Sequence, residues 1–284
     1  MNLRFVPGVN LMHRTAFLMA ALLVVSGSLF AQEPDHGFEK TSGAAATVAE
    51  LIAHPDLFVM DVQFKPMRML KTDVAGENEL IWYLVYRVVN RDLGREVDES
   101  DTRPVNAADK KITPLFAPDF TLVTADAGEA KVYHDVINPQ IQRAIERREG
   151  IKLKNPLQMM GPPPPVTAVD SPEEVKNARY GVAIWRNVDP KTDRVVLFMT
   201  GLSNGYRLST DPTGKLLVER KTVVQKFWRP GDEFEQDEEE FRFEGEPRWI
   251  YRAQKKTLGL KPKVAVGTPA KPAAAADDAG DDAA

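Results

Sequence analysis

Residues 80–90 read LIWYLVYRVVN, and this stretch decides the fold class of the chain. Apolar and aromatic side chains occupy both its odd and its even positions, and β-branched residues recur among them. Such a run favours a strand that is buried on both faces, because a strand with one face in water alternates apolar and polar residues. We therefore expect residues 80–90 to form a central strand of a sheet.

Further segments with strand character flank this run and are separated by turn residues. Asp, Pro and Gly mark tight reversals at residues 73–76 (DVAG), 189–193 (DPKTD) and 211–214 (DPTG). The other candidate strands cover residues 57–70, 115–124, 131–137, 180–188, 194–201, 216–228 and 240–251. Eight strands at hairpin-like spacing predict a mainly β fold, namely an antiparallel β-sandwich of immunoglobulin-like or related type.

One or two short helices accompany the strands. Residues 139–149 (PQIQRAIERRE) place Ile141 and Ile145 one turn apart, with the charged residues on the opposite face. Residues 42–52 can form a second short helix. That helix belongs to a polar lead-in, residues 32–53, which precedes the β-sandwich domain.

The domain itself is expected over residues 54–252, followed by a tail at 253–284. The run GPPPP at 161–165 is interpreted as a loop on the domain surface, although a stiff linker between two domains is the alternative. The tail contains Lys, then Pro and Ala, then Asp, with no apolar periodicity, and is therefore predicted to be disordered. A tethering arm is the functional alternative.

Residues 1–31 have the order of a secretory signal peptide. The charged residues Arg4, His13 and Arg14 precede an apolar run at 16–25, and small residues follow before Ala31. Met12 gives a more compact charged start than Met1, so both remain candidate initiators. A retained membrane anchor is the alternative, but Ser26-Gly27-Ser28 interrupts the run well before the ~20 apolar residues that a span needs. The protein is expected to be exported, to the periplasm or beyond, with no membrane span after cleavage.

Composition excludes several functional classes. The chain has no cysteine, so it has no disulfide, no thiolate nucleophile and no cysteine metal site. Loss of Arg4 and Arg14 with the signal, which contains no acidic residue, changes the formal net charge from −4 to −6. Such an acidic chain is a poor partner for nucleic acid.

No catalytic, cofactor or metal motif is recognisable, and we predict none of these sites. His36, His54 and His134 lack zinc-type spacing. His134 and Asp135 are adjacent on a predicted strand and so point to opposite faces, which works against a base and its orienting acid. Ser203 lies in the run GLSNG at 201–205, which has the composition of a tight turn and lacks a nucleophile elbow.

The acidic run and the aromatic residues each have ligand binding as an alternative interpretation. The acidic run at 232–240 favours a solvated hairpin loop, with calcium binding as the alternative. The aromatic residues supply core or, alternatively, a platform for sugar rings or protein. These aromatics are Trp82, Tyr83, Tyr86, Trp185, Tyr206, Phe227, Trp228, Trp249 and Tyr251.

Five phrases of the sequence carry a family resemblance. They are WYLVYRVVN at 82–90, FTLV at 120–123, VYHD at 132–135, IERRE at 145–149 and TGLSNGYR at 200–207. Over roughly residues 57–252, the extent of the strand pattern, the chain resembles a family of uncharacterised exported planctomycete-type bacterial proteins. The resemblance implies an immunoglobulin-like or related β-sandwich and no established activity.

These observations lead to two functional hypotheses. The first is a noncatalytic binding or structural module of the cell envelope, whose partner is an envelope protein or a polysaccharide. The second is a secreted glycoside hydrolase, which would use a pair of carboxylates that the sequence alone cannot select.

Overall fold

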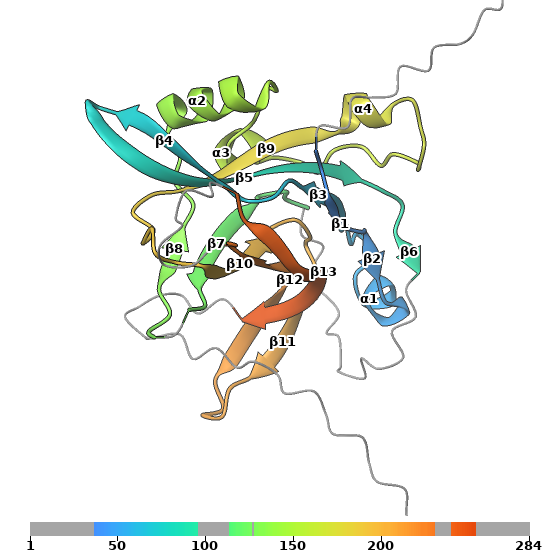
Figure 1. Ribbon diagram of the computed structural model, residues 1–284. Coiled ribbons are helices and arrows are strands. Elements are labelled where there is room, and N and C mark those ends of the chain that lie inside the picture. Colours follow the sequence, from blue (N-terminus) through green and yellow to red (C-terminus); the bar gives the residue numbers. More distant parts are fainter. Residues whose placement is uncertain (1–36, 96–113, 127, 231–239, 254–284) are drawn as a thin grey trace, which may run out of the picture. The chain divides into compact units, whose positions relative to one another are not determined.

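The computed structural model describes residues 37–95, 114–126, 128–230 and 240–253. The predicted signal peptide, most of the acidic run 232–240 and the tail from residue 254 onward lie outside these residues. The described residues form two antiparallel sheets that pack face to face, so the predicted mainly β sandwich is confirmed (Figure 1).

Sheet 1 is organised around β5 (Glu77–Asn90), the strand that contains residues 80–90. One edge of β5 pairs with two short strands, and the other edge pairs with a third. The ten residues from Ile81 to Asn90 are all buried, which confirms the central position predicted from the sequence. The other strands of sheet 1 are β1 (Lys40–Ser42), β3 (Met60–Phe64), β4 (Arg68–Val74) and β9 (Arg179–Trp185).

The single strand predicted at 57–70 is wrong, because the structure divides it into β3 and β4. β3 pairs with the C-terminal half of β5, and β4 pairs with its N-terminal half. Pro66 lies at the break between them, and proline cannot donate a hydrogen bond to a sheet ladder. The backbone N–H of Lys65 still donates to the carbonyl of Val85 at 3.0 Å, so the chain remains attached to β5 through the break.

Sheet 2 repeats the same plan around β12 (Leu216–Trp228). Two short strands pair with the two halves of one edge of β12, and a third strand pairs with its other edge. The strand at Tyr206–Thr210 was not predicted, since a segment of five residues, of which three have hydroxyl side chains, gives a weak signal. The remaining strands are β7 (Asp119–Thr124), β8 (Val132–His134), β10 (Arg194–Thr200), β11 (Tyr206–Thr210) and β13 (Arg242–Ala253).

The main core fills the space between the inner faces of the two sheets. Trp82 packs on Phe241 with ring centroids 4.7 Å apart, and Tyr86 packs on Phe120 at the same distance. Trp185 lies directly opposite Trp82 on the neighbouring strand and is also fully buried. Replacing a buried aromatic of this kind with alanine costs about 3–5 kcal/mol, so these rings hold the two sheets together.

The helix predicted at 139–149 is confirmed as α2 (Pro139–Glu149), which covers one half of the outer face of sheet 1. Its isoleucines, Ile141 and Ile145, pack against Tyr83 and neighbouring residues of β5. Asn138 caps its N-terminus, and Gly150 ends it in the left-handed region at φ 71°. Two single-turn helices, α3 (Pro156–Met159) and α4 (Glu174–Asn177), were not predicted, because one turn is too short to show periodicity.

The expected lead-in supplies strands as well as a helix. β1 pairs antiparallel with β3, and β2 (Ala45–Ala46) pairs parallel with β6 (Gly94–Arg95). The helix α1 (Val48–Ala53) begins six residues later than the sequence suggested, at the capping box formed by Thr47 and Glu50.

The proline run at 161–165 is tied to the end of β5. The side-chain amide of Asn90 donates to the carbonyl of Pro164 at 2.8 Å, and the backbone N–H of Thr167 donates to the carbonyl of Asn90 at 2.8 Å. Strands from both sides of the run belong to sheet 1, since β9 pairs with β5. Within the described ranges, no helix has both the length and the apolar character of a membrane span.

Candidate functional site

His134 and Asp135 do not form a base and its orienting acid. His134 is exposed, and none of the hydrogen bonds among the described residues joins it to Asp135. The carboxyl group of Asp135 instead accepts a long hydrogen bond of 3.4 Å from the backbone N–H of Phe120. Burial, aided by the nearby charge of Asp119, raises the pKa of Asp135 to about 6.

Ser203 is a structural residue of the turn at 200–206. Its hydroxyl donates to the carbonyl of Phe58 at 2.7 Å and accepts from the N–H of Gly205 at 3.0 Å. Gly201, in the same turn, has φ +73°, and a Cβ there would lie 1.8 Å from the carbonyl oxygen of Ala117. The geometry therefore gives Ser203 no neighbouring base and matches the predicted turn.

The described residues contain no cluster of three or more potential metal ligands. His54, one of the histidines considered from the sequence, is buried and packs against Tyr206 in a tilted arrangement with ring centroids 4.8 Å apart. His54 therefore packs as a core ring at the end of α1.

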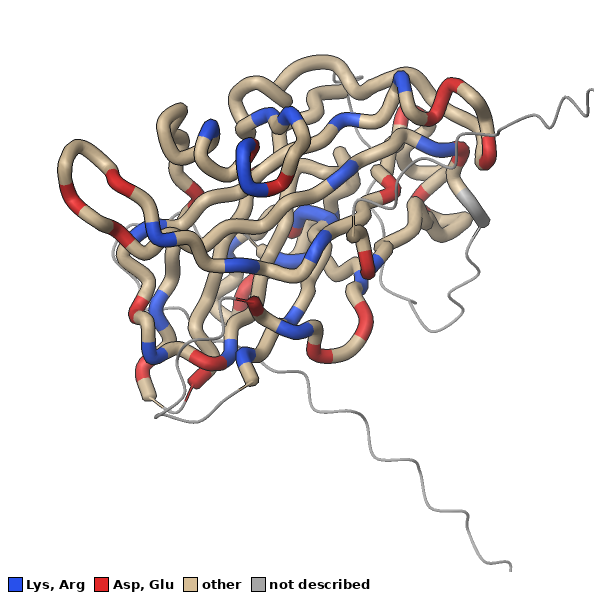
Figure 2. The backbone as a smooth tube through the Cα atoms, turned by 45° about the horizontal axis from the view of Figure 1, so that its top comes forward, with Lys and Arg blue, Asp and Glu red and all other residues tan. Residues whose placement is uncertain are grey.

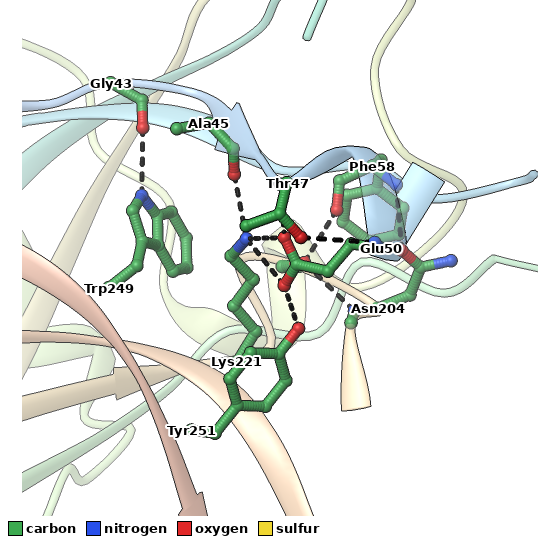
Figure 3. A network of polar contacts seen from close by, with 11 residues as sticks. Gly43, Ala45, Thr47, Glu50, Phe58, Asn204, Lys221, Trp249 and Tyr251 are labelled. Atoms are coloured by element: carbon green, nitrogen blue, oxygen red, sulfur yellow. Dashed lines mark hydrogen bonds and ion pairs between the residues drawn. The ribbon is translucent and has the colours of Figure 1, made fainter. Parts of the chain in front are cut away.

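The first buried carboxylate is Glu50 of α1, which lies at the centre of the network in Figure 3. Lys221 of β12 donates to both carboxylate oxygens, at 3.0 and 2.9 Å, and also to the carbonyl of Ala45 at 2.8 Å. The hydroxyl of Tyr251 on β13 donates to the same carboxylate, and the N–H of Thr47 donates to it at 2.7 Å. This network joins α1 to the strands of sheet 2.

Glu50 remains ionised in this network. Burial opposes its charge, but the hydrogen bonds from Tyr251 and Lys221 outweigh burial and hold the pKa of Glu50 below its ordinary value. Beside it, the indole N–H of Trp249 donates to the carbonyl of Gly43 at 2.9 Å (Figure 3). These contacts fasten the N-terminal segment, and they do not leave Glu50 available for proton transfer.

The second buried carboxylate is Glu149, at the end of α2. Lys65 contacts it at 2.8 Å, Arg68 at 3.1 Å and the hydroxyl of Tyr83 at 2.7 Å. Burial opposes the charge, whereas Lys65 and Tyr83 favour it, and the pKa of Glu149 is lowered overall. Glu149 thus joins α2 to β4 and β5.

The third cluster lies farther along the outer face of sheet 1. Glu174 of α4 pairs with Arg87 at 3.0 Å and Arg91 at 2.8 Å, and Arg91 also lies 3.4 Å from Asp61. The two arginines lower the pKa of Glu174 against its burial, whereas burial raises the pKa of Asp61. No glycosidase-type pair, with one acid held protonated across a cleft from an ionised one, is assembled here.

A shallow depression of about 470 Å³ lies beside α2. Glu146 is its single acidic residue, and that carboxylate already accepts from the N–H of Leu153 at 3.0 Å. The remaining lining consists of Pro139, Gln142, Arg143, Lys152, Leu153, Lys154 and Gln158. The depression therefore lacks the paired carboxylates that glycoside hydrolysis requires.

The outer face of sheet 2 has a different character from that of sheet 1. α2 and α4 lie over sheet 1, whereas no described helix packs on the outer face of sheet 2 (Figure 1). Across the described chain as a whole, Lys and Arg recur along the strands, while many acidic residues lie at turns and loops (Figure 2). We call this outer face the cationic face; within β10, β12 and β13, alternation and strand register assign to it Arg194, Val196, Phe198, Leu216, Val218, Arg220, Thr222, Val224, Lys226, Trp228, Arg242, Glu244, Arg248, Ile250 and Arg252.

Two arginines lie against aromatic rings on the cationic face. The guanidinium of Arg252 is 3.9 Å from the centre of the Phe198 ring, and that of Arg242 is 5.9 Å from the Trp228 ring. β12 lies between β13 and β10, so the Arg252 side chain crosses β12 to reach Phe198. This crossing helps to explain why Thr222 is fully buried on a face that no described helix covers.

Most of the aromatics belong to the core, and the aromatic platform that was the alternative interpretation is at most partly formed. Trp82, Tyr83, Tyr86, Trp185 and Phe227 are fully buried, as the core interpretation expected, whereas Trp228 is half-buried on the cationic face. The sequence analysis did not single out the arginines of this face. Arg248 and Arg252 are an even number of positions apart, so they share one face of a strand. The register with β12 is needed to show that this face also contains Arg220.

The chain matches no protein-family model, no curated protein and no solved structure.

Proposed function

We propose that this chain is an exported, noncatalytic binding or structural module of the cell envelope, and that the cationic face is its binding surface. The observation that carries the proposal is a sheet face with arginines and aliphatic side chains that no described helix covers. Exposed apolar side chains that lie together on a surface, and arginines beside them, are typical of interaction sites.

The state of the buried acids supports a noncatalytic role. Glu50, Glu149 and Glu174 each bind cationic side chains that keep their pKa values low. Such groups are ionised near neutral pH and are poor proton donors. Their partners come from different elements of the fold, which is the expected arrangement for ion pairs that fasten helices to sheets.

Export is supported by the order of charged, apolar and small residues in 1–31. We also propose that the chain belongs to the exported planctomycete-type family that it resembles, and that its sandwich is of immunoglobulin-like or related type. N-terminal sequencing of the protein from an envelope fraction tests export, with Gln32 expected as the first residue.

A secreted hydrolase remains the second candidate, and one observation favours it. Burial raises the pKa of Asp135 to about 6, and the nearby charge of Asp119 contributes to this rise. A raised pKa beside a second carboxylate is typical of the proton donor in a hydrolase. However, Asp135 does not line the depression beside α2.

The function is tested by incubating the purified mature chain with isolated envelopes and with a panel of envelope glycans. We expect the chain to sediment with the envelopes and to release no reducing ends. Release of reducing ends that disappears in Asp135→Asn would overturn the noncatalytic proposal in favour of the hydrolase.

A further inference from the structure

The cationic face combines unpaired positive charge with exposed aliphatic surface. Within the described part of the chain, no hydrogen bond or ion pair engages the side chains of Arg220, Lys226 or Arg248, and all three are exposed. Glu244 lies on the same face opposite Lys226 and pairs with Arg194 at 3.3 Å, so the end of the face that contains Lys226 is partly neutralised. The uncompensated positive charge is therefore concentrated at Arg220 and Arg248, toward the other end of the face.

Exposed aliphatic side chains continue this face toward the start of β12. Leu216 is 62% exposed and Val218 is 47% exposed. Both alternate with the inward-facing positions of the strand and lie in line with Arg220. Arginine beside exposed aliphatic surface is the composition of a protein interface, where arginine is enriched and contributes strongly to affinity.

The aromatic rings of the face argue against a sugar polymer as its ligand. Sugar rings stack on flat, open aromatic surfaces, but the Phe198 ring contacts Arg252 and the Trp228 ring faces Arg242. Leu216 and Val218 offer apolar contacts that a polar glycan cannot use well. Positive charge with aliphatic surface instead complements a peptide that carries both carboxylates and apolar side chains.

We propose that the cationic face binds an acidic polypeptide segment with interspersed apolar side chains. The inference rests on the proposed binding function and names its surface and partner class. The guanidinium groups of Arg220 and Arg248 pair with carboxylates, and Leu216 and Val218 contact the apolar side chains between those carboxylates. The partner is thus a protein of the envelope, with an acidic and partly apolar stretch.

The test uses the mature chain and three immobilised probes: a copolymer of Glu and Tyr, poly-Glu, and polygalacturonate. We expect the copolymer to bind about ten-fold more tightly than polygalacturonate, because only the copolymer offers both charge and apolar groups. The double variant R220Q/R248Q should bind the copolymer about ten-fold more weakly. The wild-type chain should also bind the copolymer more tightly than poly-Glu, and the double variant L216S/V218S should lose that preference.

The matched control is R143Q/K154Q, which removes the same charge from the depression beside α2. This control should bind the copolymer as tightly as the wild-type chain does. Equal binding of polygalacturonate and the copolymer, no binding of the copolymer, or an equal loss in R143Q/K154Q overturns the inference. If R220Q/R248Q still sediments with envelopes as the wild-type chain does, the inference and the assignment of the cationic face both fail, while a noncatalytic binding role through another surface stands.

Discussion

The guanidinium of Arg252 lies 3.9 Å from the centre of the Phe198 ring, although β12 separates the strands that carry them. Burial against the sheet lowers the pKa of Arg252, and the nearby charge of Asp119 opposes this effect. The side chain thus forms part of the surface of sheet 2 and holds its guanidinium in a fixed position. A fixed arginine loses little conformational entropy when a partner binds.

Arg252→Gln should lower the free energy of unfolding by about 1 kcal/mol, because it removes the cation–π contact with Phe198 and uncovers Thr222. Urea denaturation followed by circular dichroism measures this loss. Arg220→Gln is the matched control on the neighbouring strand and should change stability by less than about 0.5 kcal/mol. Equal losses in the two variants would show that the Phe198 contact contributes nothing.

Glu50→Gln should destabilise the protein by about 3 kcal/mol, because it leaves the ammonium group of Lys221 buried without its counter-charge. The control is Glu246→Gln, which breaks the ion pair with Lys40 where the glutamate side chain is 75% exposed, and it should cost less than about 1 kcal/mol. Comparable costs for the two substitutions would contradict the account of the Glu50 network.

Acid should weaken the fold through the three ion-paired glutamates. Glu50, Glu149 and Glu174 have folded pKa values below the ordinary 4.5, so their stabilisation is present above that pH. It is lost as the pH falls through the lower folded values. Urea midpoints measured from pH 6 down to pH 2 should decline mainly below pH about 4.5. In Glu50→Gln the decline should be smaller.

Asp135 should have the opposite pH dependence, because its folded pKa of about 6 lies above the ordinary 3.8. Its protonated form is favoured in the folded state, so its stabilisation is complete below pH 3.8 and disappears as the pH rises through about 6. Asp135→Asn should therefore be about 1–2 kcal/mol more stable than the wild type at pH 8. The difference should vanish near pH 4, and a constant difference at both pH values would contradict the assignment.

Gly201→Ala should destabilise the fold by more than about 2 kcal/mol, since residue 201 has φ +73° and its Cβ would meet the carbonyl of Ala117. Gly214→Ala is the control, because Gly214 also has a positive φ of +82° but open space around its Cβ position. It should cost only about 1 kcal/mol. Thermal unfolding of the two variants checks the difference.

The parts of the fold that depend on local periodicity were predictable from the sequence. Residues 80–90 had two apolar faces because β5 has the main core on one side and α2 on the other. The helix at 139–149 was predicted from the spacing of Ile141 and Ile145, and the structure shows that Asn138 and Gly150 cap its two ends. By contrast, the break at Pro66 and the short strand β11 were missed because pairing partners decide short strands.

Most of the candidate site could not be predicted from local patterns in the sequence. Arg252 and Phe198 are 54 positions apart in the sequence, and only the order of β10, β12 and β13 brings them together. The partners of Glu50 are more distant still, 171 positions away on β12 and 201 positions away on β13. Sequence patterning could place residues on strand faces, but it could not determine which strands lie side by side.

The most direct test of the central claim is co-sedimentation of the mature chain with isolated envelopes, comparing the wild type, R220Q/R248Q and R143Q/K154Q at low and moderate salt. The account predicts that the wild type and R143Q/K154Q are retained at low salt, that R220Q/R248Q is largely released, and that salt weakens retention. Equal retention of all three proteins, or no retention of the wild type, would contradict the assignment of the cationic face as the binding surface.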